Sequence, residues 1–226
     1  MNKPEVLKLI GDVGVIPVVR AANTDEAILV VEAIKAGGLS ILEITMTVPR
    51  AVQVIETLSA RYGDEAIVGA GTVLDPESAR ACIHAGAQFI VSPALNLQTI
   101  DSCRELDIAV IPGALTPTEI VSAWSAGADL VKVFPAGAMG GPNYIKSLKA
   151  PLPQIKLVPT GGVTLANAAA FIEAGAAAVG VGADLVDTSA LRAGQPEKIT
   201  KAAQAFIEAV RNARREAGSI RVPLGA

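Results

Sequence analysis

Two ionisable residues interrupt apolar segments that are typical of buried β-strands. Lys132 lies in the run Leu130–Val133, and Glu43 lies in the run Ile41–Ile44. A lysine in an apolar strand must reach water, find a counter-charge or lose its proton, and the neutral amine is a nucleophile that can condense with a carbonyl group. A buried carboxylate is costly without a partner. If both side chains point into one interior, each is a plausible partner for the other, and Lys132 is a candidate for covalent carbonyl chemistry.

Both residues also have structural interpretations. The head group of Lys132 could reach water at a strand end, and Glu43 could be a strand-end carboxylate that faces solvent. Taken from its own strand alone, Lys132 favours the structural interpretation. Two ionisable interruptions on two otherwise apolar strands, however, favour a shared site.

The elements that would position these residues recur along the chain. Apolar strand-like runs return about every 20 to 27 residues, and each is followed by a turn and a helix-like segment. An N-cap is expected at Thr24, and helix starts are expected at Pro49, Pro76 and Pro117. The eight strand candidates are Val15–Val19, Ile41–Ile44, Ile67–Gly69, Phe89–Val91, Ala109–Ile111, Leu130–Val133, Lys156–Val158 and Ala178–Val181.

Alternating strands and helices predict an α/β fold with a parallel sheet, and eight such units suggest closure into a (β/α)8 TIM barrel. A doubly wound open sheet is the alternative, but no glycine-rich dinucleotide turn opens the first helix. We expect a single barrel domain over residues 1–226. It would have a short N-terminal helix at Pro4–Ile10, a last helix at Pro196–Arg215 and a mobile tail from Gly218 to Ala226.

Composition narrows the classes of function. Of 226 residues, 51% are hydrophobic and 3% aromatic, which suits parallel strands covered by helices. A formal net charge of −3 without a basic cluster argues against nucleic acid as a partner. Cys82 and Cys103 are expected to be buried thiols, and with His84 as the one histidine we expect no metal or cofactor. No run is long and apolar enough to span a membrane, and we expect a cytoplasmic protein.

Polar residues and glycines gather where the strands end, which is where barrel active sites form. Arg20 ends the first strand, and Thr72 and Pro93 follow the third and fourth. The turns after the seventh and eighth strands contain Gly161-Gly162 and Gly182. Glycine turns also occur for packing alone, but they let backbone N–H groups approach an anion. Their position in a barrel predicts a phosphate site.

Seven short motifs carry a resemblance to a known family, and they are LEITMTVP (Leu42–Pro49), VGAGTV (Val68–Val73), FIVSP (Phe89–Pro93), IPGALTPTE (Ile111–Glu119), LVKVFPA (Leu130–Ala136), PTGGV (Pro159–Val163) and AVGVGA (Ala178–Ala183). In order and spacing they resemble, over nearly the full chain, the class I aldolases that act on 2-keto-3-deoxy-6-phosphogluconate and 4-hydroxy-2-oxoglutarate. Members of that family are (β/α)8 barrels that usually assemble as trimers, so the resemblance implies a homotrimer.

The resemblance also implies roles for individual residues. Lys132 would form the Schiff base, Glu43 would be the acid/base, and Thr72 would help to hold pyruvate. Phe134 would form part of an apolar wall that keeps the amine neutral. The expected substrate-binding residues are Arg20, Thr47, Thr72, Pro93, Phe134, Thr160, Gly161, Gly162, Gly182 and Ala183.

Two positions depart from the best-known members of the family. Thr47 stands where some members carry an arginine that binds the substrate carboxylate, and Arg20 is our candidate for that role. Ala183 stands where some carry a phosphate-contacting serine. The missing hydroxyl would leave phosphate to the backbone of the glycine turns.

The resemblance implies a metal-independent lyase of carbohydrate metabolism. Its partners would be a small-molecule 2-keto acid and pyruvate, with glyceraldehyde 3-phosphate or glyoxylate as the second product. One alternative is the related 2-keto-3-deoxy-6-phosphogalactonate aldolase. Others are a phosphosugar isomerase that uses Glu43 as a base, and a barrel retained as an oligomeric assembly scaffold.

Overall fold

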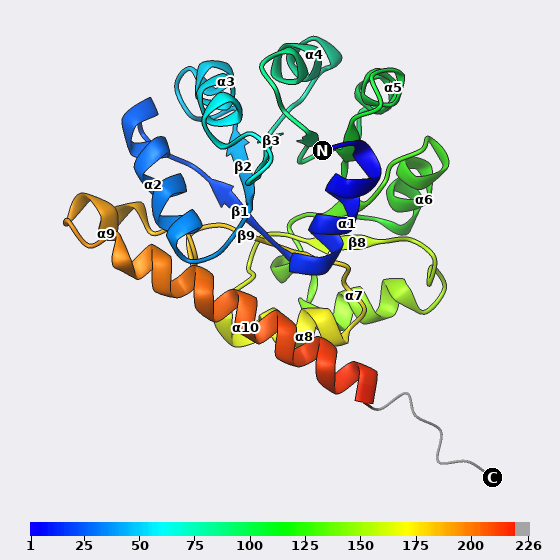
Figure 1. Ribbon diagram of the computed structural model, residues 1–226. Coiled ribbons are helices and arrows are strands. Elements are labelled where there is room, and N and C mark those ends of the chain that lie inside the picture. The colour runs from blue at the N-terminus through cyan, green and yellow to red at the C-terminus, as the bar shows by residue number, and fades with distance from the viewer. Residues whose placement is uncertain (220–226) are drawn as a thin grey trace.

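The computed structural model describes the backbone of residues 1–219 and the side chains of residues 1–216. Figure 1 shows helices arranged around a central group of strands. Every paired strand runs parallel to its neighbour. Over the described residues the strands are β1 (Val15–Val19), β2 (Ile41–Thr45), β3 (Ile67–Gly71), β4 (Phe89–Val91), β5 (Ala109–Ile111), β6 (Gly113–Ala114), β7 (Val131–Val133), β8 (Leu157–Pro159) and β9 (Val179–Val181).

The strands form two sections that together make a barrel. One section has the order β5-β4-β3-β2-β1-β9, and the other has the order β6-β7-β8. A parallel bridge between Thr160 and Gly180 joins the end of β8 to β9. At the other junction, Pro112 divides one strand into β5 and β6, and its carbonyl accepts a hydrogen bond of 2.9 Å from the backbone N–H of Lys132. The expected (β/α)8 barrel is confirmed, with the fifth strand interrupted at this proline.

Helices follow the strands and cover the barrel on its outside (Figure 1). Both expected terminal helices are present, and the last one begins close to its expected start. The helices are α1 (Lys3–Val13), α2 (Thr24–Ala36), α3 (Ala51–Tyr62), α4 (Pro76–His84), α5 (Leu97–Glu105), α6 (Pro117–Ser125), α7 (Pro142–Lys149), α8 (Leu165–Glu173), α9 (Thr188–Arg192) and α10 (Glu197–Ser219), with a 3-10 turn η1 (Gly137–Met139).

The expected C-terminal tail is partly wrong. It was placed at Gly218–Ala226, whereas α10 continues through Gly218 to Ser219. The rest of that tail, 220–226, lies outside the described residues.

Two of the three expected helix starts are confirmed. Pro76 and Pro117 each open a helix, where the missing proline N–H costs no hydrogen bond. The expected N-cap at Thr24 and the expected helix start at Pro49 are wrong. Asn23, not Thr24, caps α2, because its extended backbone lets its side chain accept from the N–H of Glu26. Pro49 precedes α3 without opening it, since the intervening residue has left-handed backbone geometry and the helix begins after it.

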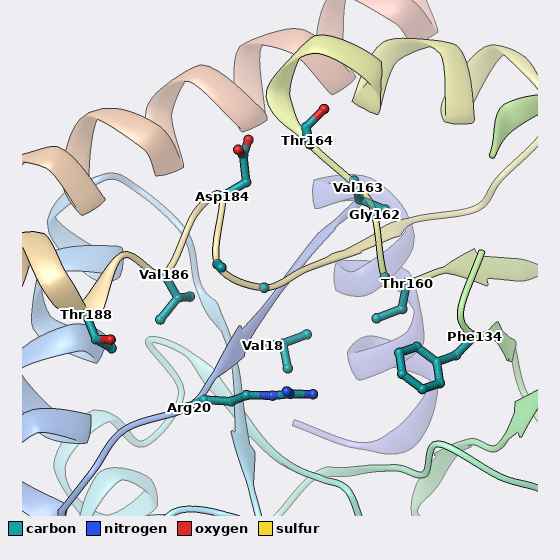
Figure 2. Close-up of a pocket in the computed structure, with 13 residues that line it drawn as sticks. Val18, Arg20, Phe134, Thr160, Gly162, Val163, Thr164, Asp184, Val186 and Thr188 are labelled. Carbon is teal, nitrogen blue, oxygen red and sulfur yellow. The ribbon is translucent and has the colours of Figure 1, made fainter. Parts of the chain in front are cut away.

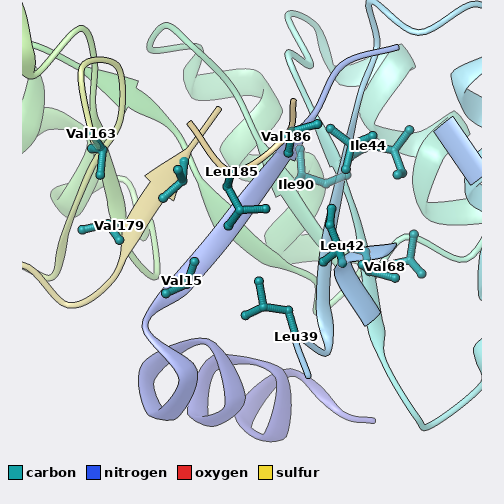
Figure 3. Packing of buried hydrophobic residues seen from close by; sticks show 14 of the residues in the cluster. Val15, Leu39, Leu42, Ile44, Val68, Ile90, Val163, Val179, Leu185 and Val186 are labelled. Carbon is teal, nitrogen blue, oxygen red and sulfur yellow. The ribbon is translucent and has the colours of Figure 1, made fainter. Parts of the chain in front are cut away.

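Strand alternation divides the apolar side chains into an outer and an inner core. The outer core packs strands against helices, and Figure 3 shows Leu42 and Ile44 within it. The inner core fills the barrel and contains Ile41 and Leu130. Glu43 lies two residues from Ile41, and Lys132 lies two residues from Leu130, so both share the inward side of their strands.

Helix α1 closes one end of the barrel. Val6 and Ile10 on this helix are buried in the inner core. Lys3 pairs with Asp129 just before β7, with Nζ 3.0 Å from Oδ2. The same carboxylate accepts a hydrogen bond of 2.9 Å from the N–H of Val110 on β5. The helix is therefore attached to the base of the strand that carries Lys132.

Candidate active site

Lys132 and Glu43 are the two ionisable residues that the barrel strands bury. The exposed fraction is 5% for Lys132 and 2% for Glu43. Lys132 is paired in register with Gly113 and Val158 on the neighbouring strands. Since both side chains occupy inward positions above the apolar inner core, the interpretation of Lys132 as a solvent-reaching lysine is wrong, and so is that of Glu43 as a solvent-facing carboxylate.

Burial changes the pKa of both groups in the direction that favours the neutral form. Burial lowers the pKa of the Lys132 amine, the charge of Glu43 opposes that change, and the charge of Arg20 adds to it. Burial raises the pKa of the Glu43 carboxyl, while Lys132 and Arg20 oppose that change. The three residues therefore form one electrostatic unit, and its amine is more easily neutralised than an ordinary lysine.

One oxygen of the Glu43 carboxyl group, Oε1, is buried and has no hydrogen-bond partner among the described residues. Because buried polar atoms are almost always paired, an unpaired oxygen beside a buried amine marks a position where a ligand or water can bind.

Small residues make room for these groups. A Cβ atom at Gly71 on β3 would lie 2.0 Å from Oε1 of Glu43, so this carboxylate occupies the space that a side chain would need. A Cβ atom at Gly180 on β9 would likewise lie 2.3 Å from Oγ1 of Thr160. Glycine at these positions is a steric requirement of the site.

Phe134 provides the apolar side of the lysine environment. Its ring centroid lies 5.3 Å from Nζ of Lys132, so the ring helps to shield the amine from water. The ring is also part of the wall of a cavity at the carboxyl ends of the strands.

That cavity has a volume of about 550 Å³ and is lined by Val18 of β1 and by residues that follow β1, β7, β8 and β9. Figure 2 shows the guanidinium of Arg20 extending toward Phe134 and Thr160. Arg20 is exposed and has no hydrogen-bond or ion-pair partner among the described residues. The expected site residues that line the cavity are Arg20, Phe134, Thr160, Gly161, Gly162, Gly182 and Ala183.

The other expected substrate-binding residues do not line this cavity. Thr47 is exposed, and its hydroxyl lies 2.7 Å from the hydroxyl of Thr45, within hydrogen-bond distance. Thr72 follows β3 with a φ of 59°, a left-handed conformation that is strained for a β-branched residue. The backbone of Pro93 packs against Gly113. A Cβ atom at Gly113 would lie 2.2 Å from the carbonyl carbon of Pro93.

Sequence reasoning missed six residues of the cavity wall. Val18 shares strand parity with Arg20, which was an available signal. Asp184 accepts a hydrogen bond of 2.7 Å from the N–H of Leu165 at the start of α8. The missed residues are Val18, Val163, Thr164, Asp184, Val186 and Thr188.

The two cysteines are not placed to act as nucleophiles. Cys82 and Cys103 are buried free thiols, and burial raises their pKa to about 11 and about 12. Among the described residues, no group of three or more His, Cys, Asp or Glu side chains is arranged to hold a metal ion. No described helix has the length and apolar character that crossing a membrane requires.

Comparison with known sequences gives one consistent result. Residues 6–202 match the family model described as Aldolase: KDPG and KHG aldolase. The chain is 41% identical over 200 residues to the 2-dehydro-3-deoxy-6-phosphogalactonate aldolase of Escherichia coli K12, covering 88% of this chain and 95% of that protein. It is 36% identical over 194 residues to the KHG/KDPG aldolase of the same strain, and the match covers 86% of this chain and 91% of that protein.

Solved structures agree with the sequence matches. A structure described as native KDPGal superposes with a TM-score of 0.81 at 40% identity, covering 89% of this chain and 96% of that one. The KDPG aldolase of Legionella pneumophila, with pyruvate captured as a covalent carbinolamine intermediate, superposes with a TM-score of 0.80 at 30% identity, covering 88% and 97%.

Proposed function

Because the chain belongs to the KDPG and KHG aldolase family and is an aldolase, we propose that it cleaves a 2-keto acid to pyruvate and an aldehyde through a Schiff base on Lys132. The candidate substrates are 2-keto-3-deoxy-6-phosphogluconate and 4-hydroxy-2-oxoglutarate. The 6-phosphogalactonate compound is the second candidate, and the 41% identical relative favours it. Family membership favours an aldolase over the isomerase and scaffold interpretations.

The proposed reaction begins with the neutral amine of Lys132. It attacks the C2 ketone of the substrate, and loss of water gives an iminium. The iminium accepts the electron pair of the C3–C4 bond as that bond breaks, which yields an enamine and an aldehyde. Glu43 takes the proton of the C4 hydroxyl, directly or through a water, and returns a proton to C3 of the enamine. Hydrolysis of the resulting imine releases pyruvate and restores the amine.

Two anionic groups of the substrate need partners. Arg20 is the cation that lines the cavity, and we assign it to the substrate carboxylate, since Thr47 cannot replace an arginine. The backbone of Gly161, Gly162 and Gly182 is our candidate for the phosphate group. Ala183 offers no hydroxyl at this position.

One observation carries the proposal: the buried amine of Lys132 has a lowered pKa and lies on the inner side of the barrel with Glu43, whose Oε1 has no hydrogen-bond partner among the described residues. Incubation with pyruvate and borohydride should fix a stable adduct, which peptide mapping by mass spectrometry places on Lys132. Lys149 is an internal control, because burial also lowers its pKa but Nζ donates to the carbonyls of Pro153 and Ile155. An adduct on Lys149 instead, or full activity in Lys132→Met, would refute the mechanism.

The substrate is identified by a pyruvate-release assay over the three candidate 2-keto acids. A preference for the galactonate compound would select the second candidate.

We also propose a cytoplasmic homotrimer. A related structure at 38% identity and a TM-score of 0.84 is titled as a protein cage designed by fusing symmetric oligomeric domains, which supports oligomerisation. Light scattering coupled to size-exclusion chromatography measures the mass.

A further inference from the structure

We infer that the ion pair between Glu26 and Arg192 is a positioning element that holds Arg20 in the active-site cavity. Glu26 lies in the first turn of α2 and is only 7% exposed. Arg192 is the last residue of α9 and is its cationic partner. The arginine Nε lies 2.7 Å from Oε1 of Glu26, and a second guanidinium nitrogen lies 3.2 Å from Oε2. The contact is therefore bidentate, a geometry that fixes both side chains.

The same carboxylate also fixes the loop that follows Arg20. Oε2 of Glu26 accepts a hydrogen bond of 2.6 Å from the N–H of Ala22. Asn23 accepts from the N–H of Glu26, so the loop and the first turn of α2 hold each other. Ala22 lies two residues beyond Arg20. Since Arg20 has no hydrogen-bond or ion-pair partner among the described residues, its position depends on this backbone.

The ion pair joins two segments that line one cavity. Arg20 comes from the segment after β1, whereas Val186 and Thr188 come from the segment that enters α9. Figure 2 shows all three of these residues around the cavity. Glu26 and Arg192 are 166 residues apart in sequence, so their contact is a long-range link between the two segments.

Loss of Arg192 would leave a buried carboxylate without its counter-charge. Arg192 is the main reason that the pKa of Glu26 lies below its ordinary value, so the carboxylate is held charged. An uncompensated buried charge is strongly unfavourable, and it would be relieved by movement of the loop toward water. Small displacements of a binding group weaken a site considerably, because the geometry is no longer prepared before the substrate arrives.

A double-mutant cycle tests this inference, which rests on the proposed role of Arg20. In Arg192→Gln we expect the KM for the preferred 2-keto acid to rise about 3- to 10-fold with kcat within about twofold. In an Arg20→Ala background the same change should have no further effect on KM. Arg192→Lys should recover part of the loss. Arg61→Gln is the matched control, since it removes an ion pair of 2.7 Å between α3 and Glu32 of the same helix α2, and its KM should be unchanged.

The outcomes separate this inference from the proposed function. An unchanged KM in Arg192→Gln overturns the inference and indicates that the ion pair has no role in substrate binding. An equal KM increase with and without Arg20 also overturns it and indicates general destabilisation. Absence of pyruvate release by the wild-type protein refutes the proposed function instead. In that case calorimetric titration with pyruvate measures the same cycle without turnover, and coupling between Arg20 and Arg192 would still be expected.

Discussion

The carboxylate of Glu43 occupies the space above Gly71, so close that a Cβ atom at residue 71 would lie 2.0 Å from Oε1. These residues lie on adjacent parallel strands, β2 and β3. The substitution Gly71→Ala should therefore displace the carboxylate while leaving the lysine in place. We expect kcat to fall about 10- to 100-fold, as for a misplaced acid/base group. Borohydride trapping of pyruvate at Lys132 should remain within about twofold of wild type.

Gly11→Ala is the control for this substitution. Gly11 lies in α1, and a Cβ atom there would meet no atom within 4 Å. Alanine should stabilise the helix by about 0.5–1 kcal/mol and leave kcat unchanged. Normal kcat in Gly71→Ala would mean that Glu43 is not the acid/base.

The pH dependence of kcat/KM should report the amine of Lys132. Because the pKa of this amine lies below its ordinary value of 10.5, the neutral form is available at lower pH than for a surface lysine. The rate should decline on the acid side as the pH falls through that pKa and the amine becomes protonated. A kcat/KM that keeps rising up to the pKa of an ordinary lysine would show that burial does not activate the residue.

Removal of the Phe134 ring should raise the pKa of Lys132. The ring lies 5.3 Å from Nζ, and its loss lets water solvate the charged form. In Phe134→Ala the acid limb of kcat/KM should move to higher pH, because a higher pH is then needed to neutralise the amine. Phe134→Leu keeps an apolar side chain and should show a smaller movement. Identical acid limbs in all three proteins would contradict this role of the ring.

The buried pair Lys132 and Glu43, which we propose to be catalytic, should reduce the stability of the protein. Replacing buried charged pairs with well-packed neutral groups often stabilises proteins, so Lys132→Met combined with Glu43→Gln should add about 1–2 kcal/mol and raise the Tm by about 2–8 °C. Since the folded-state pKa of Lys132 lies below the unfolded value, the unfolded chain binds more protons between the two values. Wild-type stability should therefore rise with pH in that window, and the double variant should lose this rise. Thermal unfolding over a pH series measures both effects. A lower Tm in the double variant would show that the pair stabilises the barrel.

Arg20 should contribute mainly to substrate affinity. Its guanidinium lies in the cavity wall without a hydrogen-bond or ion-pair partner in the described part of the chain, so we expect Arg20→Ala to raise KM about 10- to 100-fold, the loss of a charged hydrogen bond. Arg20→Lys should be intermediate, because an ammonium group cannot make the bidentate contact. Steady-state kinetics with pyruvate release as the readout would test this. A reduced kcat at unchanged KM would assign Arg20 to the chemical step.

Strand periodicity was sufficient to predict the barrel and to place Glu43 on the same strand face as Ile41 and Lys132 on the same face as Leu130, but not to decide that these faces point inward. Side-chain parity is local, so a strand such as Ile41–Thr45 shows in its own sequence which residues share a face, whereas all five of its residues are buried. The division of one strand at Pro112 was not predicted, because it depends on the change of hydrogen-bond partner from β4 to β7.

Contacts between distant segments could not be predicted in the same way. Nothing near Glu26 in sequence indicates that Arg192 binds it, and nothing near Ala183 indicates which of the following residues line the cavity. The N-cap of α2 could not be predicted from the sequence either, although it depends on neighbouring residues. Asn23 and Thr24 are both good capping residues, and only the backbone conformation decides between them.

The closure of the barrel by α1 gives the proposed reaction an order. Val6 and Ile10 fill the end opposite the cavity, and the cavity lies at the carboxyl ends of the strands, where we place the entry of the substrate. Lys132 lies level with Val158, below the glycine turn that follows β8. A ketone bound to this amine is therefore the deeper reactant, and the aldehyde is the outer one. In cleavage the aldehyde departs first and pyruvate last, and in synthesis pyruvate must enter before the aldehyde covers it.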